Sequence, residues 1–287
     1  MSIKFKLLIQ NPELESNNYQ ALNSDYLTNT LSSNFYLPIV KDKPFIFSCF
    51  ALSVDGKLCY PDLPSGFAIA KENHFASQEE RDADWFSLLL ARSISDAVII
   101  GRNSLQHEHH DYSAKINIAE LLELRKSLNK PDNLLHIVIT RDCENIDFEQ
   151  ELLTQNNDIP VIIFCEKSPI KMHPNFKIKS IAEINLTDLK QIVTTKNFTL
   201  PILIDKLFTL GIKTFLNESP YYHHILQEQQ LLNEAWLNTS SIYIGGQVTA
   251  LGINNNSFNS KNHPHYTILS LHNIGYNFLY TRYKVSY

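Results

Sequence analysis

The amino-acid sequence predicts an α/β fold, with a mostly parallel sheet that helices cover on both faces and a C-terminal antiparallel hairpin. Two patterns support this prediction. Short apolar runs of strand length alternate with longer stretches of helical periodicity, as in strands joined by crossover helices. The last two strand-like runs, residues 266–271 and 276–285, flank the turn sequence Asn273-Ile274-Gly275 and predict the hairpin. This order is typical of a helix-covered sheet with an antiparallel edge.

The first half of the chain contains four runs that predict strands. The run Phe45–Leu52 is apolar and rich in aromatic residues, and a turn dipeptide, Asp-Gly, follows it. The other three runs cover residues 97–100, 135–139 and 160–165. Two helices are predicted between the strands. Ser77 and Glu80 have the spacing of a capping box at the start of the first helix, and residues 118–128 form the second.

The second half continues the alternation. Residues 200–210 predict a helix that ends at Gly211, because glycine readily adopts the left-handed conformation of a helix end. A short strand over residues 213–216 leads into another helix, which ends near residue 232. A further strand is predicted over residues 241–244, directly before a Gly-Gly pair.

Composition and charge argue against several classes of protein. Apolar residues make up 44% of the 287-residue chain, which is enough to build a core. The net charge is −5 and no Lys/Arg cluster is longer than a pair, so we expect no nucleic-acid partner. No run of about 18 apolar residues occurs, so we expect no transmembrane helix and no membrane partner. The first residues show no cleavage-site pattern, and we expect no signal peptide.

The four cysteines lie far apart in the sequence, and no two of them form a C-x-x-C pair. They are Cys49, Cys59, Cys143 and Cys165. Cys49 and Cys165 fall within apolar strand-like runs, where a free thiol packs as a small hydrophobic group. Free thiols are therefore the expectation, with zinc or disulfide use as the less favoured alternative. A reducing, cytoplasmic location follows by default.

Residues 1–43 differ from the rest of the chain. They are rich in Asn, Ser, Leu and Tyr, contain no glycine and show no sustained periodicity. Their apolar content argues against full disorder. We expect an N-terminal appendage that packs on the domain or pairs at its sheet edge, with residues 44–287 as the main domain.

Ligands of such sheets bind beyond the carboxyl ends of the strands, which directs attention to three strand-end regions. The first is residues 51–57. A small residue, a hydroxyl and then Asp55-Gly56-Lys57 allow the backbone to approach a ligand and place a carboxylate and an ammonium beside it. Taken alone, the segment also fits an ordinary Asp-Gly turn, which is the more common case.

The second region begins at Gly101, directly after a buried strand. The start of the following helix, with Arg102 and Ser104, suits a phosphate, although a glycine that serves only packing fits equally. The third region combines residues 218–220 with residues 245–246. A Gly-Gly pair after a strand allows close approach to a flat or phosphorylated ligand, and a bulge or turn is an equally good explanation.

Residues 107–111 read His-Glu-His-His-Asp, and their three imidazoles and two carboxylates could bind a metal ion. No remote ligand is evident, and polar loops are often simply solvated, so metal binding is the less favoured interpretation. The sequence lacks H-x-E followed by P-C-x-x-C, which excludes a zinc deaminase domain. We therefore assign no metal ligand.

Four motifs, in this order, resemble the reductase half of the bifunctional deaminase/reductase of riboflavin biosynthesis, a family with a dihydrofolate-reductase-like fold. Ala51, Ser53, Asp55, Gly56 and Lys57 match the family's A-x-S-x-D-G-K/R motif. A helix with two arginines then leads to residues 96–104, with serine in place of a family threonine. Residues 211–220 and 233–246 match the two later motifs. The resemblance covers residues 44–287.

The resemblance implies hydride transfer from NADPH to a ribosylamino-pyrimidine or a related pterin-like small molecule, with the chemistry supplied by the nicotinamide. The implied catalytic residues are Asp55 and Glu218. The implied cofactor-binding residues are Ala51, Gly101, Arg102, Ser104, Glu108, Ser219, Pro220, Gly245 and Gly246. The implied substrate-binding residues are Ser53, Lys57, Arg81 and Lys115. The resemblance also suggests a homodimer, formed through the C-terminal hairpin.

The sequence departs from the family at one motif that matters for the cofactor. The family's Glu-Gly-Gly is Glu218-Ser219-Pro220 in this chain, which adds side chains and removes one backbone N–H. We also expect no deaminase half. These departures leave an alternative open, in which a diverged, catalytically impaired relative acts as a binding or assembly protein.

Overall fold

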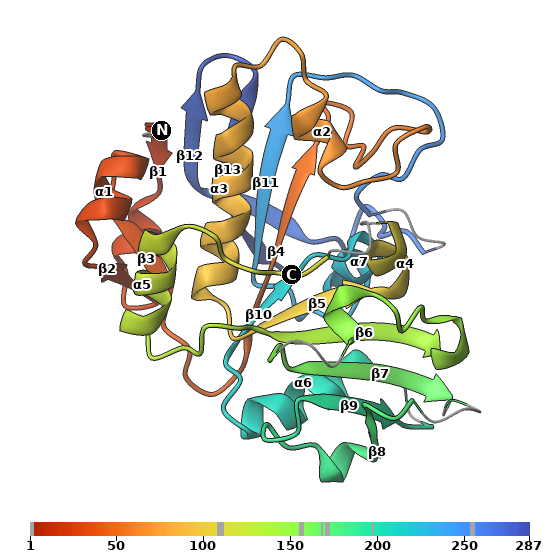
Figure 1. Ribbon diagram of the computed structural model, residues 1–287. Helices are drawn as coiled ribbons and strands as arrows, with labels where there is room; N and C mark the ends of the chain where they lie inside the picture. The colour runs from red at the N-terminus through yellow and green to blue at the C-terminus, as the bar shows by residue number, and fades with distance from the viewer. Residues whose placement is uncertain are drawn as a thin grey trace. The chain divides into compact units, whose positions relative to one another are not determined.

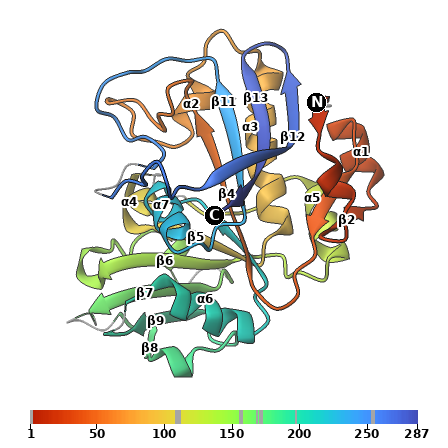
Figure 2. The same ribbon diagram turned by 180° about the vertical axis from the view of Figure 1, so that it is seen from behind.

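The computed structural model describes residues 3–107, 112–154, 158–167, 169, 173–196, 198–252 and 256–287. The chain forms two compact units, each assembled from segments that are distant in sequence (Figures 1 and 2). The first unit comprises Met1–Lys41, Phe45–Ala91 and Pro220–Tyr287. The second comprises Asp42–Pro44 and Arg92–Ser219.

The first unit contains a mixed sheet with the strand order β1-β12-β13-β11-β4. Its strands are β1 (Lys6–Gln10), β4 (Phe45–Leu52), β11 (Glu234–Ser240), β12 (His265–Ile274) and β13 (Phe278–Ser286). Strand β11 runs parallel to β4 and antiparallel to β13. Strands β12 and β13 form the predicted C-terminal hairpin, and β1 pairs with β12 in antiparallel register. The N-terminal segment therefore extends this sheet.

Helix α3 (Gln78–Ile94) packs on one face of these strands, as the two opposite views show (Figures 1 and 2). It begins with the predicted capping box: Ser77 Oγ accepts from Glu80 N at 3.2 Å, and Glu80 Oε2 accepts from Ser77 N at 2.7 Å. Glu80 Oε1 also accepts from the backbone N–H of Tyr276 and of Asn277. One carboxylate thus joins the start of the helix to the turn of the hairpin.

The remaining elements of the first unit are short. They are η1 (Pro12–Glu15), α1 (Asp25–Leu31), α2 (Ala68–Lys71), α7 (Pro220–Glu228) and a two-stranded sheet of β2 (Tyr19–Leu22) and β3 (Phe35–Pro38). Arg282 on β13 donates to both carboxylate oxygens of Glu234 on β11 and to the carbonyl oxygen of Tyr36 on β3. Tyr19 on β2 donates to the same carboxylate at 2.9 Å. This buried cluster anchors the N-terminal segment.

The second unit contains a parallel sheet with the strand order β10-β5-β6-β7-β9-β8. Its strands are β5 (Ala97–Gly101), β6 (Leu135–Asp142), β7 (Val161–Lys167), β8 (Lys177–Lys179), β9 (Lys190–Thr194) and β10 (Thr214–Asn217). Every pair of neighbours is parallel. Its helical elements are α4 (Arg102–His107), η2 (Cys143–Asn145), α5 (Ala119–Ser127), η3 (Glu151–Leu153), η4 (Ile181–Glu183) and α6 (Leu200–Thr209). The predicted α/β class, with parallel strands and a C-terminal antiparallel pair, is confirmed.

The predicted strand over residues 241–244 is wrong. The strand lies earlier, at β11, where polar residues flank a short apolar stretch, so the run lacks the continuous apolar pattern of a buried strand. Residues 242–245 instead bond to the loop after β4: Ile242 O accepts from Val54 N, and the backbone N–H of Gly245 donates to Asp55. Residues 241–244 contain Ile, Tyr and Ile, which favour strands, but in the structure they form a loop.

The expectation of four free cysteines is also wrong. Cys143 in η2 and Cys165 in β7 form a disulfide, with their Cα atoms 6.4 Å apart, a normal separation for such a bond. Cys49 and Cys59 are free and buried. The parallel pairing of β6 with β7 brings the two bonded residues together, and their spacing of 22 residues gave no sign of it.

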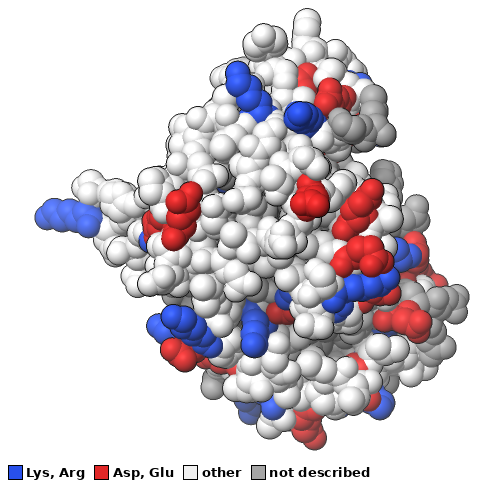
Figure 3. Space-filling view, turned by 90° about the vertical axis from the view of Figure 1, so that its left-hand side faces the viewer, with Lys and Arg blue, Asp and Glu red and all other residues white. Residues whose placement is uncertain are grey.

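Among the described residues, none of the helices is both long and apolar enough to cross a membrane. On the face drawn in Figure 3, the Lys and Arg side chains that are described lie among Asp and Glu side chains, with uncharged surface between them. The described part of that face has no continuous basic stripe of the kind that follows a phosphate backbone.

Asp84 on α3 gives a prediction about pH dependence. Burial raises the pKa of Asp84 to about 6, although Asn238 Nδ2 donates to its Oδ1 at 2.8 Å. Because the folded-state pKa exceeds the unfolded value of 3.8, ionisation destabilises the fold as the pH rises from about 4 through about 6. We expect Asp84→Asn to gain about 3 kcal/mol of stability relative to wild type over that window.

Urea denaturation of both proteins on either side of this pH window measures the difference. Asp82→Asn removes the same charge from the same helix at a side chain that bonds only to Gln78 on the exposed side, and serves as the control. A wild-type-to-Asp84→Asn difference that does not change with pH would contradict the role given to burial.

Candidate functional site

The loop after β4 is folded around the hydroxyl of Ser53. Ser53 Oγ donates to Asp55 Oδ1 at 2.7 Å and accepts from Lys57 N at 2.8 Å, and the side chain is buried. The backbone N–H of Ser53 donates to the carbonyl oxygen of Lys57, which closes the turn. Gly56, at φ +74°, occupies the left-handed position that this turn requires. Ser53, Asp55, Gly56 and Lys57 of the first motif therefore determine the shape of this loop.

Asp55 connects this loop to the Gly-Gly turn after β11. Its Oδ2 accepts from Gly245 N at 2.8 Å, and its Oδ1 accepts from Ile244 N at 3.2 Å. Lys57 Nζ donates to the carbonyl oxygen of Gly246 at 2.9 Å. Two motifs that lie 190 residues apart are thus brought together within the first unit.

These hydrogen bonds fix the protonation state of Asp55. The hydroxyl of Ser53, followed by the N–H groups of Gly245 and Ile244, lowers the pKa of Asp55 to about 2. Asp55 is therefore an ionised acceptor near neutral pH and does not serve as a proton donor there. Both of its oxygens already accept hydrogen bonds from the protein.

The backbone at Gly246 is open on one side. Gly245 and Gly246 both have positive φ angles, +72° and +64°. A side chain at Gly245 would meet the ring of Tyr243 at 3.3 Å, whereas a side chain at Gly246 would meet nothing within 4 Å. Tyr243 itself is 74% exposed. A flat ligand can approach the backbone here, as the Gly-Gly pair predicts.

Glu218, the second predicted catalytic carboxylate, lies in a buried cluster of the second unit. Arg92 donates to both of its oxygens, through Nε at 2.7 Å and through a terminal nitrogen at 2.8 Å. The hydroxyl of Tyr112 donates to Glu218 Oε2 at 2.7 Å. The backbone N–H of Glu218 donates to the carbonyl oxygen of Ile99 on β5. Three segments of the unit meet at this carboxylate.

The electrostatics of Glu218 follow from the same contacts. Burial opposes its ionisation, but the Arg92 guanidinium and the Tyr112 hydroxyl outweigh burial and hold the pKa of Glu218 below its usual range. Glu218 is therefore an ionised acceptor and not a general acid at neutral pH. Its side chain is 10% exposed.

Tyr112 was missed in the sequence, and no local signal could have found it. It lies 106 residues from Glu218, in a segment without periodicity. His136 holds that segment, since its Nε2 accepts from Ala114 N at 3.0 Å while Nδ1 faces the carbonyl oxygen of Leu134. Burial lowers the pKa of His136 to about 4, so the ring is neutral.

Ser219 and Pro220, predicted to bind the cofactor, have clear structural roles. The side chain of Asn217 accepts from Ser219 N at 3.1 Å and donates to Ser219 O at 3.0 Å. Pro220 is the first residue of α7, a position where the missing N–H of proline costs no hydrogen bond. Neither residue offers a backbone N–H to a phosphate in this arrangement.

The predicted phosphate-binding turn lies at the end of β5. Gly101 is the last residue of the strand, and α4 begins at the next residue, Arg102. Arg102 and Ser104 lie in the first turn of α4, and both are partly exposed. Glu108 lies outside the described residues. So do four of the five residues of the predicted metal-binding alternative, 108–111.

The other predicted residues lie apart from these contacts. Ala51 is within β4, in register with Asn238 of β11. Arg81, predicted to bind substrate, donates to the carbonyl oxygens of Asn73 and Ala76 at 3.2 Å and so braces the segment before α3. Its other terminal nitrogen donates to the side-chain oxygen of Gln78 at 3.0 Å. Lys115 Nζ forms an exposed ion pair with Glu151 at 2.8 Å.

The Arg92–Glu218 pair generates a stability prediction. Arg92→Met leaves a buried carboxylate without its guanidinium, so we expect a loss of about 3–5 kcal/mol in the free energy of unfolding at pH 7. The double variant Arg92→Met/Glu218→Met removes both charges and should recover most of that loss. Urea denaturation of the three proteins tests this. A double variant no more stable than Arg92→Met would show that the uncompensated charge is not the cause.

Comparisons with known proteins agree with this architecture. No family model and no curated protein matches the sequence. Among solved structures, a pyrimidine reductase-like protein from Corynebacterium diphtheriae superposes with a TM-score of 0.61 at 16% identity, over 85% of this chain and 92% of that one. RibD from Acinetobacter baumannii gives 0.58 at 14% identity, over 91% of this chain and 61% of that one.

The riboflavin biosynthesis reductase Rib7 from Saccharomyces cerevisiae gives a TM-score of 0.54 at 12% identity, over 87% of this chain and 93% of that one. At these identities the likeness concerns the fold. The resemblance inferred from the four motifs is confirmed at that level: the chain has the dihydrofolate-reductase-like fold of the pyrimidine reductases of riboflavin biosynthesis.

Proposed function

We propose that this protein is an NADPH-dependent reductase that acts on a ribosylamino-pyrimidine or a related pterin-like small molecule, in or near riboflavin biosynthesis. The observation that carries the proposal is the bonding of Asp55 to the Gly245 turn, which joins two of the motifs that the resemblance rests on. The fold shared with pyrimidine reductases supports it.

The residues of the second unit fit part of a dinucleotide phosphate. Arg102 and Ser104, on the first turn of α4, supply a guanidinium and a hydroxyl, both of which are strong donors to phosphate oxygens. Ser219 and Pro220 do not add to this set, because one N–H is bonded to Asn217 and the other does not exist. We therefore assign the phosphate contacts to Arg102 and Ser104.

In this proposal the chain's own residues position the cofactor and the substrate. Asp55 and Glu218 are ionised and do not donate protons. NADPH, when bound, would supply the hydride, and the proton that the reduction also consumes would come from water. Asp55 holds the Gly245 turn in the shape that leaves Gly246 open to a flat ring. Glu218 fixes Arg92 and Tyr112 within the second unit. Catalysis in this proposal rests on pre-organised geometry.

The proposal is tested by titrating NADPH into the protein and following the nicotinamide fluorescence. We expect saturable binding in the micromolar range. Arg102→Ala removes the charge-assisted contact and should weaken binding at least about tenfold. Lys126→Ala removes the same charge from an exposed position on α5 and is the matched control.

Turnover completes the test. Oxidation of NADPH in the presence of the ribosylamino-pyrimidine substrate is followed by the loss of nicotinamide absorbance. Absence of detectable NADPH binding by protein whose folding is verified by circular dichroism would contradict the proposal. So would equal affinities of wild type and Arg102→Ala if turnover is also absent.

One observation favours a second candidate function, that of a diverged relative that binds or assembles without catalysis. Glu218 is fully engaged by Arg92 and Tyr112, and the adjacent Ser219 N–H is engaged by Asn217. If wild type fails to bind NADPH, replacing Ser219-Pro220 by Gly-Gly tests whether the altered segment is what prevents binding. Restored binding would identify this segment as the reason for the loss.

We also propose that the protein is a homodimer and that it is cytoplasmic. The Cys143–Cys165 disulfide argues against the second part, because disulfides are rare in cytosolic proteins.

A further inference from the structure

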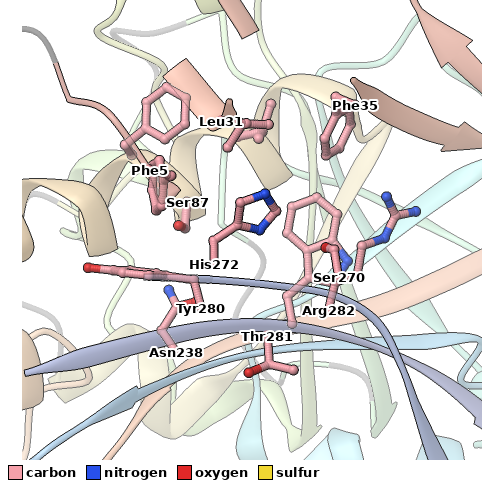
Figure 4. A pocket seen from close by; sticks show the side chains of 13 residues that line it. Phe5, Leu31, Phe35, Ser87, Asn238, Ser270, His272, Tyr280, Thr281 and Arg282 are labelled. Atoms are coloured by element: carbon pink, nitrogen blue, oxygen red, sulfur yellow. The ribbon is translucent and has the colours of Figure 1, made fainter. Parts of the chain in front are cut away.

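The first unit contains a cavity of about 60 Å³ between its N-terminal segment, α3 and the C-terminal strands (Figure 4). Two of its lining residues, Trp236 and Asn238, fall within the motif at residues 233–246. The other lining residues lie outside the four matched residue ranges. Because a water molecule's share of liquid volume is about 30 Å³, this space corresponds to about two water molecules. The pocket is open on one side, so a single six-membered ring with one substituent can enter it with one edge exposed.

Aromatic rings form most of the cavity wall. Phe5 of the N-terminal segment contacts Phe86 of α3 at 5.8 Å and Tyr280 of β13 at 4.9 Å, measured between ring centroids. On the other side, Phe35 lies 5.9 Å from Trp236, with the two rings nearly perpendicular. A wall of this kind favours an aromatic guest, which can pack edge-to-face or in offset stacks.

His272 is the polar group at the centre of this wall. In Figure 4 its ring rises from β12 toward Leu31, between Phe5 and Phe35. Its Nε2 lies 3.3 Å from Ser33 Oγ, and within the described part of the chain Nδ1 has no hydrogen-bond partner. The residue is only 8% exposed. Burial lowers its pKa to about 4, so the ring is neutral and Nδ1 is available to one hydrogen bond.

Among the described lining residues the only cation is Arg282, and its charge is already neutralised. Arg282 donates to Glu234 through two nitrogens and to the carbonyl oxygen of Tyr36 through the third. An anionic guest would therefore find no free positive charge among the described lining residues, and a buried anion without a partner is strongly disfavoured. The lining thus selects for a neutral molecule.

We propose that this cavity is a binding site for a small neutral aromatic molecule with one hydrogen-bonding group, which pairs with His272. The N-terminal segment contributes Phe5, Leu31 and Phe35 to the wall, so the site depends on a part of the chain that the reductase resemblance does not cover. Occupation of the cavity stabilises the packing of that segment, because the guest contacts it together with α3 and β12.

Phenol is the probe, and benzene, which lacks the hydroxyl, is its comparison. Saturable binding to the full chain is measured by ligand-observed NMR and by the rise in Tm. We expect millimolar affinity for phenol, as suits a ligand of this size, and weaker binding of benzene. His272→Phe keeps an aromatic ring but removes the hydrogen bond, and should weaken phenol binding about three- to tenfold without weakening benzene binding.

Ser87 on α3 provides a matched pair of variants, since its side chain lines the cavity and bonds only to Ala83 O. Ser87→Phe fills the space and should abolish binding of both probes, whereas Ser87→Ala leaves the space and should retain it. No saturable binding of phenol to wild type, or equal binding to wild type and His272→Phe, overturns the proposal. Unchanged binding to folded Ser87→Phe overturns it as well.

Discussion

Each unit contains a buried guanidinium–carboxylate pair that joins segments distant in sequence. Arg282 binds Glu234 in the first unit, and Arg92 binds Glu218 in the second. Neither charge can remain buried without its partner, because desolvation of an unpaired ion costs several kcal/mol. Each pair therefore requires that two distant segments meet in one arrangement, which makes it a constraint on the fold as much as a source of stability.

The pairs also set the chemistry that remains possible. Glu218 is held ionised by Arg92, and Asp55 is held ionised by Ser53 and the backbone of the Gly245 turn. Both carboxylates that the motifs single out are acceptors with their bonds already made. In the proposed reaction the nicotinamide would carry the hydride, and the proton that the reduction also consumes would come from water, because neither ionised carboxylate holds one. The proposed phosphate contacts are assigned to the start of α4, because the Ser219-Pro220 segment offers no free backbone N–H.

Sequence reasoning succeeded where local pattern and tertiary environment agree. Strand β5 is buried on both faces, so its apolar run was unambiguous, and the capping box at Ser77 depends only on neighbouring residues. Prediction from the sequence failed where the structure of a segment depends on a partner that is distant in sequence. Strand β11 has a largely polar sequence and is identified only by its pairing with β4 and β13, and Tyr112 acquires its role only by meeting Glu218. The disulfide likewise depends on the pairing of β6 with β7.

The central proposal is that this protein binds NADPH through the start of α4 and not through the Ser219-Pro220 segment. A crystal structure of the protein soaked with NADPH tests it most directly. The account predicts density for phosphate groups within hydrogen-bond distance of Arg102 and Ser104 and none against the backbone of Ser219. Phosphate density at Ser219 with none at Arg102 would contradict that assignment, and a well-diffracting soaked crystal without any cofactor density would contradict the function itself.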